Sequence, residues 1–349
     1  MEKVMSRKLI TISTIMTLMS TSVIADVPNV AADIAPIHSL VSRVMDGVGA
    51  PKLIVQSGAS PHGYRLRPSE AKALQDADHV FWMGEELTPW LDSAIGTLAS
   101  KASVTTLLDQ QGVILHDFRE GALFEAHDHS AHGDDDHDDH DDHDDHDEHD
   151  DHKDHDDHKD HDDHDDHKDH DDHDDHDDHG SHDPHAWLSP ENAKLWLNII
   201  ASKLSVSDPE NAATYFMNAA AGQAEIEAMI AEVKATLKPV QGGKFVVFHD
   251  AYQYFENDFD FYASGAISLS DSSDPSPARI EKVQKRIRDE GIQCVLAEPQ
   301  FKKGLVATVM EGSDATASVI DPLGAELETG PKLYTRLIKN MAKTLRNCL

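Results

Sequence analysis

Residues 208–237, DPENAATYFMNAAAGQAEIEAMIAEVKATL, form the longest helical pattern in the chain. Their larger apolar side chains recur with helical spacing, at Phe216, Ile226, Ile230, Val233 and Leu237. Pro239 and the glycines at 242 and 243 end the pattern. At about 1.5 Å per residue the helix would reach roughly 45 Å, which is more than one lobe needs. The stretch therefore predicts a strut between two lobes.

Short apolar strands alternate with helices on both sides of this stretch. Before it we expect strands at 53–55, 79–83, 104–108 and 113–116, and helices at 34–49, 69–77, 88–98 and 189–204. After it we expect strands at 244–248, 261–267, 293–297 and 318–320. We also expect one helix that follows the first of these strands and ends at 255, and further helices at 275–288, 303–311 and 334–346. Such alternation is typical of parallel α/β sheets. The predicted fold class is therefore α/β, with two (β/α) lobes (26–207 and 240–349) joined by one long rigid helix (208–239).

A histidine occurs at every third position from His137 to His179, fifteen in all, and the spacers are almost all Asp. Segment 134–179 carries 28 acidic residues and three lysines, so it holds −25 of the net charge of −35. It has no apolar side chain whose burial could offset a backbone ordering cost of about 1–2 kcal/mol per residue. Imidazole and carboxylate groups bind divalent metals. We expect residues 127–182 to be a disordered metal-collecting loop, with a plain acidic linker as the alternative.

The rest of the chain is only moderately acidic, with a net charge of −10, and shows no cluster of Lys and Arg. A nucleic-acid partner is therefore not expected. About 300 residues lie outside the loop, enough for two ordinary domains or one large one.

The first 25 residues have the pattern of a secretory signal peptide. Three basic residues precede an apolar run at 9–24, and cleavage is expected after Ala25. An uncleaved anchor is the alternative. No other run approaches about 18 consecutive apolar residues, so the mature protein is expected to be soluble, and we take it to be a monomer.

Cys294 and Cys348 are the only cysteines. In an exported protein such a pair is most simply a disulfide, here between a predicted strand and the last predicted helix. Two unpaired buried thiols are the alternative. The two positions lack the ligand spacing of a Cys-based zinc site.

Several polar residues lie where α/β sheets bind ligands, outside the carboxyl ends of the strands. His62, His249 and Asp321 each follow a predicted strand, and His185 begins the segment that enters a helix after the acidic loop. Three imidazoles with a carboxylate or an open position are a set that Zn²⁺ takes tetrahedrally. We therefore predict that these four residues converge on a metal ion between the lobes.

Other residues of the same types have different expected roles. His38, in the first turn of a predicted helix, and His79 and His116, at apolar strands, are expected to be structural. Glu298 also ends a strand and is a candidate ligand or a partner that orients a ligand.

The combination of motifs resembles the zinc-specific periplasmic substrate-binding proteins of ABC importers (ZnuA type, metal-binding cluster A-I). The matching stretches are 58–64 (GASPHGY), 66–69 (LRPS), 183–190 (DPHAWLSP), 248–252 (FHDAY), 297–301 (AEPQF) and 321–324 (DPLG). With the signal, the loop and the cysteine pair, the resemblance covers essentially the whole chain.

The resemblance implies two (β/α) lobes, a long helix between them and one high-affinity Zn²⁺ at their interface. Its histidine ligands would be His62, His185 and His249. Relatives often have an acidic residue before the first histidine, where this chain has Pro61. The fourth place is then left to Asp321, water or a loop histidine, and we choose Asp321 because related metal binders use an Asp near this position.

The implied function is capture of Zn²⁺ in the periplasm and its delivery to an ABC permease driven by an ATPase, with the loop scavenging additional zinc. No catalysis is expected. A zinc hydrolase is the rival from another class, but the chain has no H-E-x-x-H, no G-x-S-x-G and no evident general base. The same motifs are compatible with a periplasmic zinc buffer or metallochaperone and with a manganese-binding protein of the same fold. Three histidines favour zinc over manganese.

Overall fold

The computed structural model describes residues 27–119, 124, 182–268, 275–300 and 303–349. The predicted signal peptide and all but the last residue of the predicted loop at 127–182 lie outside these residues. In the ranges that the structure describes, no helix combines the length and the apolar character needed to cross a membrane.

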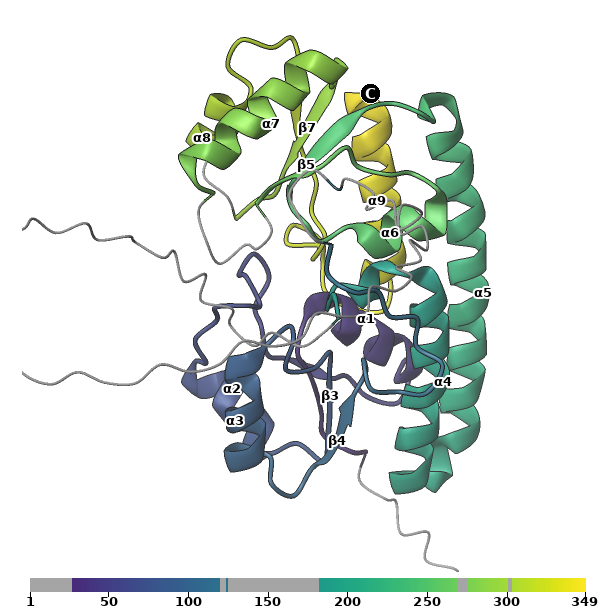
Figure 1. The fold of residues 1–349 in the computed structure, drawn as a ribbon. Helices are drawn as coiled ribbons and strands as arrows, with labels where there is room; N and C mark the ends of the chain where they lie inside the picture. The colour runs from purple at the N-terminus through teal and green to yellow at the C-terminus, as the bar shows by residue number, and fades with distance from the viewer. Residues whose placement is uncertain (1–26, 120–123, 125–181, 269–274, 301–302) are drawn as a thin grey trace, which may run out of the picture.

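Two four-stranded parallel sheets form the two lobes (Figure 1). The first has the order β2-β1-β3-β4, from strands Lys52–Leu53, Val30–Ala32, His79–Trp82 and Ser103–Thr106. The second has the order β6-β5-β7-β8, from strands Ala266–Ser268, Phe245–His249, Cys294–Ala297 and Thr316–Val319. Every pairing is parallel, which confirms the predicted fold class.

One face of each sheet is covered by its own pair of helices. In the first lobe α2 (Pro68–Gln75) and α3 (Pro89–Leu98) pack on Ala31, Val80 and Trp82. In the second, α7 (Pro277–Glu290) and α8 (Lys303–Val309) pack on Val246, Phe248 and Val295. Because successive strand residues point to opposite faces, the alternate residues of these strands are left for a second layer.

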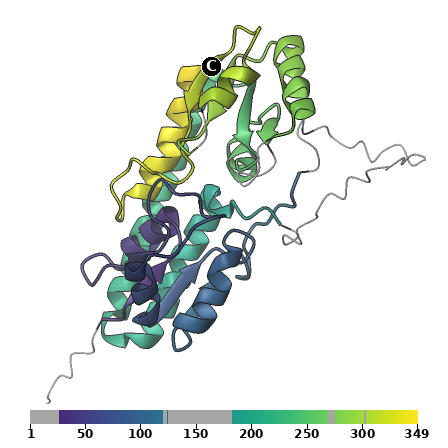
Figure 2. The ribbon, with the colours of Figure 1, turned by 90° about the vertical axis from the view of Figure 1, so that its left-hand side faces the viewer.

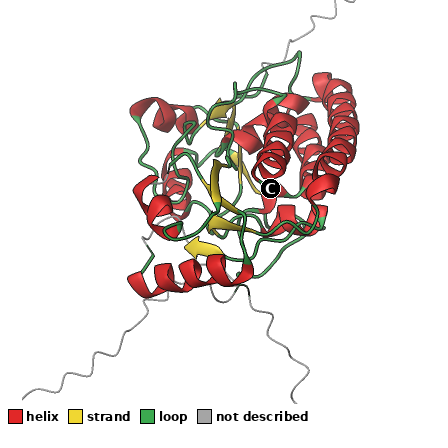
Figure 3. Ribbon diagram, turned by 90° about the horizontal axis from the view of Figure 1, so that it is seen from above, coloured by secondary structure: helices red, strands yellow, loops and turns green. Residues whose placement is uncertain are grey.

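That second layer is shared by both lobes. It consists of α1 (Ala35–Val44), α4 (Pro190–Ser207), α5 (Ala212–Leu237) and α9 (Leu333–Cys348). Their buried side chains form one continuous apolar cluster with Phe81 of β3 and with Val247 of β5. Figure 3 shows the strands between helices on two sides, and Figure 2 shows α9 (yellow) reaching from the second lobe to the first. The core of the molecule therefore runs through both lobes without interruption.

Helix α5 is the predicted strut. Its 26 residues span about 39 Å and run along both lobes (Figure 1). A 3₁₀ turn, Pro209–Asn211, precedes it, and the Asp208 carboxylate accepts the Tyr215 hydroxyl at 2.7 Å. Its one glycine, Gly222, lies where a Cβ would come within 2.9 Å of Leu197 and 3.1 Å of Arg43. The glycine therefore allows α5 to approach α4 and α1 closely.

One strand predicted from the sequence was wrong, and one strand was missed. The expected strand at 113–116 is not formed, because the side-chain amide of Asn192 bonds both the N–H (2.8 Å) and the carbonyl (3.0 Å) of Ile114. A single antiparallel bridge joins Asp117 to His182 instead. Conversely, the three-residue strand β1 was not predicted, although it lies at the centre of the first sheet.

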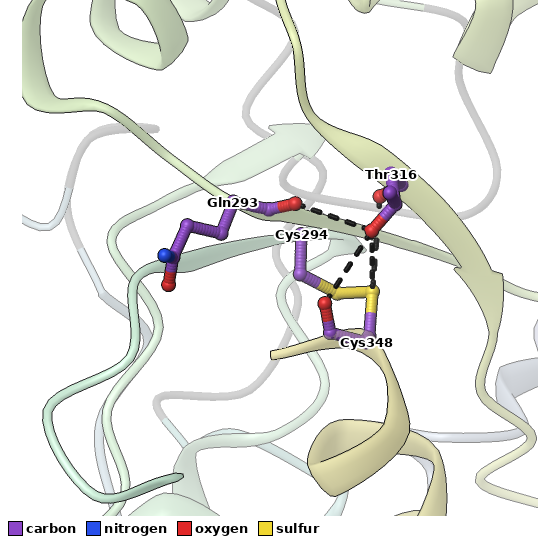
Figure 4. Close-up of a disulfide and its surroundings, with 4 residues drawn as sticks. All are labelled: Gln293, Cys294, Thr316 and Cys348. Carbon is purple, nitrogen blue, oxygen red and sulfur yellow. Dashed lines mark hydrogen bonds between the residues drawn. A yellow bond between two sulfur atoms is a disulfide. The ribbon is translucent and has the colours of Figure 1, made fainter.

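The disulfide Cys294–Cys348 is present, as the even cysteine count predicted (Figure 4). It joins the first residue of β7 to the last residue of α9. The hydroxyl of Thr316, on β8, donates to the carbonyls of Gln293 (3.3 Å) and Cys348 (3.4 Å) beside it. The bond therefore fastens the C-terminal helix to the centre of the second sheet.

Replacing both cysteines by alanine is expected to lower the free energy of unfolding of the metal-free protein. The cross-link spans a sequence separation of 54, and the chain-entropy model gives a loss of about 4 kcal/mol for such a loop. Urea unfolding followed by circular dichroism measures it, with the chemically reduced wild type as the control. An unchanged unfolding midpoint would show that the bond does not stabilise the fold.

Candidate metal site

Loops after strands of both sheets bring the predicted residues to one region between the lobes. His249 is the last residue of β5, Glu298 directly follows β7, and Asp321 lies two residues beyond β8. His62 lies in the turn-rich segment after β2, and His185 precedes a 3₁₀ turn, Ala186–Leu188, that leads into α4. Ser189 caps α4 and Pro190 is its first residue, as the sequence predicted.

His185 and His249 face each other across the lobe boundary. Their Nε2 atoms are 3.4 Å apart and both side chains are buried. Two nitrogens that bind one tetrahedral zinc at 2.0–2.1 Å are themselves about 3.3–3.4 Å apart. The pair is therefore already at the spacing of two ligands on a common ion.

A carboxylate holds the other ring nitrogen of each histidine. Asp183 Oδ1 lies 2.7 Å from His185 Nδ1, and Glu298 Oε1 lies 2.5 Å from His249 Nδ1. Because an ionised carboxylate only accepts hydrogen bonds, each Nδ1 carries the proton and each Nε2 presents a lone pair. Such carboxylate–histidine pairs orient metal ligands and raise their basicity.

His62 supplies a third imidazole from the first lobe. Its ring centroid is 5.6 Å from that of His185, and its side chain is partly exposed. The indole N–H of Trp90 donates to the carbonyl of Pro61 at 2.7 Å, and the Tyr64 hydroxyl donates to Glu70 at 2.7 Å. The turn that carries His62 is thus tied to α3 on one side and to α2 on the other.

The three histidines line a small, partly open space of about 10 Å³, roughly that needed by one water molecule. Its lining consists of Pro61, His62, His185, Trp187, His249, Glu298, Gln300, Pro322 and Leu323. The indole N–H of Trp187 donates to the carbonyl of Pro322 at 2.8 Å, and this hydrogen bond connects the two lobes beside the space. The size of the space is that of a single small ion or water molecule.

Asp321 does not line this space, although the next two residues, Pro322 and Leu323, do. Its carboxylate accepts hydrogen bonds from the backbone N–H groups of Leu323 (3.0 Å), Gly324 (2.8 Å) and Ala325 (2.6 Å).

Tyr252 is buried close to both carboxylates. Its burial, together with the charges of Glu298 and Asp321, raises the pKa of its hydroxyl well above the usual value. Glu298 occupies the orienting position for His249 and also accepts Gln300 Nε2 at 2.7 Å.

No three His, Cys, Asp or Glu side chains within the described ranges are yet grouped closely enough to hold a metal ion. His185 and His249 stand at ligand spacing, and we attribute the difference to His62, the partly exposed member of the trio.

The remaining described histidines with expected structural roles lie elsewhere and have protein partners. His38 Nε2 lies 3.2 Å from the Pro51 carbonyl, His79 Nε2 lies 2.7 Å from Ser207 Oγ, and His116 Nε2 lies 3.2 Å from Asn257 Nδ2. None of the three lines the space between His185 and His249. This placement agrees with the structural role expected for them.

Sequence reasoning did not assign a role to Asp183, which orients His185, or to Arg119, which pairs with Asp250 and Glu256. A signal for Asp183 was present, because Asp183-Pro184-His185 places a carboxylate two residues before a proposed ligand. Arg119 had no local signal, since its partners lie more than 130 residues away.

Comparison with known proteins identifies the family of the chain. The family model described as ZnuA, zinc-uptake complex component A periplasmic, matches residues 30–348. The high-affinity zinc uptake system protein ZnuA of Brucella abortus (strain 2308) is 48% identical over 320 residues, covering 92% of this chain and 91% of its own length. That of Paracoccus denitrificans is 44% identical over 326 residues, covering 93% of each chain.

Solved structures share the fold at lower sequence identity. A ZnuA crystal structure superposes with a TM-score of 0.67 at 20% identity, covering 93% of this chain and 99% of its own. A ZnuA deletion mutant with zinc bound gives 0.66 at 20%, covering 93% of this chain and 98% of its own. The laminin-binding adhesin of Streptococcus agalactiae gives 0.67 at 19%, covering 92% and 99%. With its family model matched over nearly its whole length, the chain belongs to the family of periplasmic component A proteins of zinc-uptake complexes.

Proposed function

We propose that the chain captures Zn²⁺ between its lobes with His62, His185 and His249 and delivers it to the permease and ATPase of an ABC importer. The Zn²⁺ ion is cargo here, and the chain is a transport binding protein and not an enzyme. The observation that carries the proposal is the 3.4 Å separation of His185 Nε2 and His249 Nε2, which come from different lobes.

The two carboxylate-bound histidines would act as a preformed half-site. Asp183 and Glu298 fix the ring orientations before any ion arrives, so two of the ligands need no reorganisation. His62 would complete the trio by a small movement of its turn. Three neutral imidazoles suit zinc, whereas manganese sites rely on carboxylates, so the ligand set supports zinc as the cargo.

Asp321 is our proposal for the fourth ligand. A carboxylate has about four lone-pair positions, and Asp321 uses three of them on backbone N–H groups. Its neighbours Pro322 and Leu323 line the space, so a small rotation would bring the free position to the ion. Glu298 is less suited, because moving it would release His249 Nδ1.

Segment 134–179, which lies outside the described residues, would collect additional zinc. Its 15 histidines and 28 acidic residues raise the local cation concentration. The described chain resumes at His182, three residues after the end of this segment and three before His185, so the segment adjoins the proposed site in sequence.

Deletion of 134–179 is expected to leave one tight zinc site and to remove the weaker ones. In that background, His185→Ala should weaken the tight site by at least about a hundredfold, because a direct ligand contributes more than an orienting partner. Calorimetric titration measures both effects. His182→Ala is the matched control, because His182 lies close in sequence, is exposed and pairs with Asp117.

Two results would contradict the proposal, each in a different way. If the tight site disappears with 134–179, the cleft is not the transport site and a zinc buffer is the better description. If His182→Ala weakens the tight site as much as His185→Ala does, the ligand assignment fails.

Asp321→Asn and Glu298→Gln are expected to have different effects, because we propose that Asp321 binds the metal whereas Glu298 orients His249. With cobalt(II) in place of zinc, Asp321→Asn should change the visible absorption spectrum, which reports the metal's ligands and geometry. Glu298→Gln should keep that spectrum, because the glutamine carbonyl can still accept the His249 Nδ1–H. A spectrum changed by Glu298→Gln and not by Asp321→Asn would assign the fourth place to Glu298.

A further inference from the structure

Arg119 carries an ion-pair cluster across the boundary between the lobes. It lies two residues beyond Asp117, which forms an antiparallel bridge with His182. Its guanidinium enters the second lobe, where Nε lies 3.0 Å from both carboxylate oxygens of Asp250 and Nη1 lies 2.6 Å from Glu256 Oε2. The Phe124 ring covers the guanidinium at 3.5 Å from its centroid.

The two carboxylates depend on this arginine. The Asp250 side chain is 8% exposed and that of Glu256 is 2% exposed. Among the described residues, Arg119 makes the ion pairs with both of them, and Asp250 also lies in the field of Arg279. Removal of one member of such a buried cluster leaves uncompensated charge, which proteins relieve by movement or by water entry. The cluster therefore holds the two lobes in one relative position.

The contacts of Arg119 lie next to His185 and His249, the two proposed ligands at zinc-binding spacing. Asp250 directly follows His249, and Glu256 lies on α6 (Gln253–Phe259). On the same helix, the Tyr254 hydroxyl donates to the carbonyl of Asp183 at 2.7 Å and accepts the N–H of His116 at 3.1 Å. Helix α6 thus contacts the segment before His185 and, through Arg119, the residue after His249.

We propose that Arg119 is a positioning residue that presses α6 against the first lobe, fixes the His185–His249 spacing and so sets how fast zinc leaves the cleft. The inference rests on the proposed function. Arginine suits the role because its planar fork serves two carboxylates at once, whereas a lysine ammonium is a point donor on a flexible stem.

The test is the rate of zinc release from the full-length mature protein, measured by stopped-flow mixing with an excess of chelator. Arg119→Gln is expected to keep one tight zinc site and to release its ion about 10- to 100-fold faster, as interface changes act mainly on dissociation. Arg119→Lys should show a smaller acceleration, because it keeps the charge and loses the fork.

Arg43→Gln is the matched control. Arg43 also makes a two-point ion pair, with Glu225 at 3.2 and 3.1 Å, but Glu225 is half exposed. The two residues lie on α1 and α5, and neither lines the space between the ligand histidines. Its zinc release is expected to stay at the wild-type rate. Equal acceleration in Arg43→Gln would overturn the inference, because the effect would then be general destabilisation.

The remaining outcomes are equally decisive. A wild-type release rate in Arg119→Gln overturns the inference and leaves the proposed function intact. If Arg119→Gln does not fold, Arg119→Lys decides, since it retains the compensating charge, and a wild-type rate there overturns the inference. Absence of a tight zinc site in the wild type would refute the proposed function itself, and with it this inference.

Discussion

The apolar side chains of α5 pack against α1 and α4 of the first lobe and against α9 of the second, and this shared core fixes the relation of the two sheets. A site whose nitrogens come from different lobes needs such a constraint, because zinc ligation tolerates only a few tenths of an ångström. The disulfide at the end of α9 ties the same helix layer to the second sheet. Packing far from the site therefore helps to keep the Nε2 atoms of His185 and His249 3.4 Å apart.

Against that rigid frame, the site combines fixed and adjustable parts. His185 and His249 are buried and each is held by a carboxylate, whereas His62 lies partly exposed on a turn. In the proposed site His185 and His249 would keep their positions, while His62 and the Asp321 carboxylate would move toward the ion. Arg119 adds an electrostatic tie at the one place where α6 approaches both fixed ligands. In this account, capture depends on the turn of His62, and retention depends on the contact between the lobes.

The sequence predicted the features that have local causes. Strand–helix alternation indicated the fold class, the long helical pattern at 208–237 indicated the strut, and strand ends located His249 and Glu298. The three residues of β1 were missed because so short a buried strand has no periodicity, and the strand at 113–116 was wrong because a side chain, Asn192, replaces the ladder bonds. The pairing of Arg119 with Asp250 depends on tertiary contact across 131 residues, which no local pattern encodes.

The measurement that tests the central claim most directly is anomalous diffraction at the zinc edge, from crystals of the chain without 134–179. The account predicts one fully occupied zinc, about 2.0–2.1 Å from Nε2 of His62, His185 and His249. The His185–His249 Nε2 separation should stay near the present 3.4 Å, with His62 as the residue that has moved. A zinc held by two or fewer of these histidines, or lying outside the space they line, would contradict it.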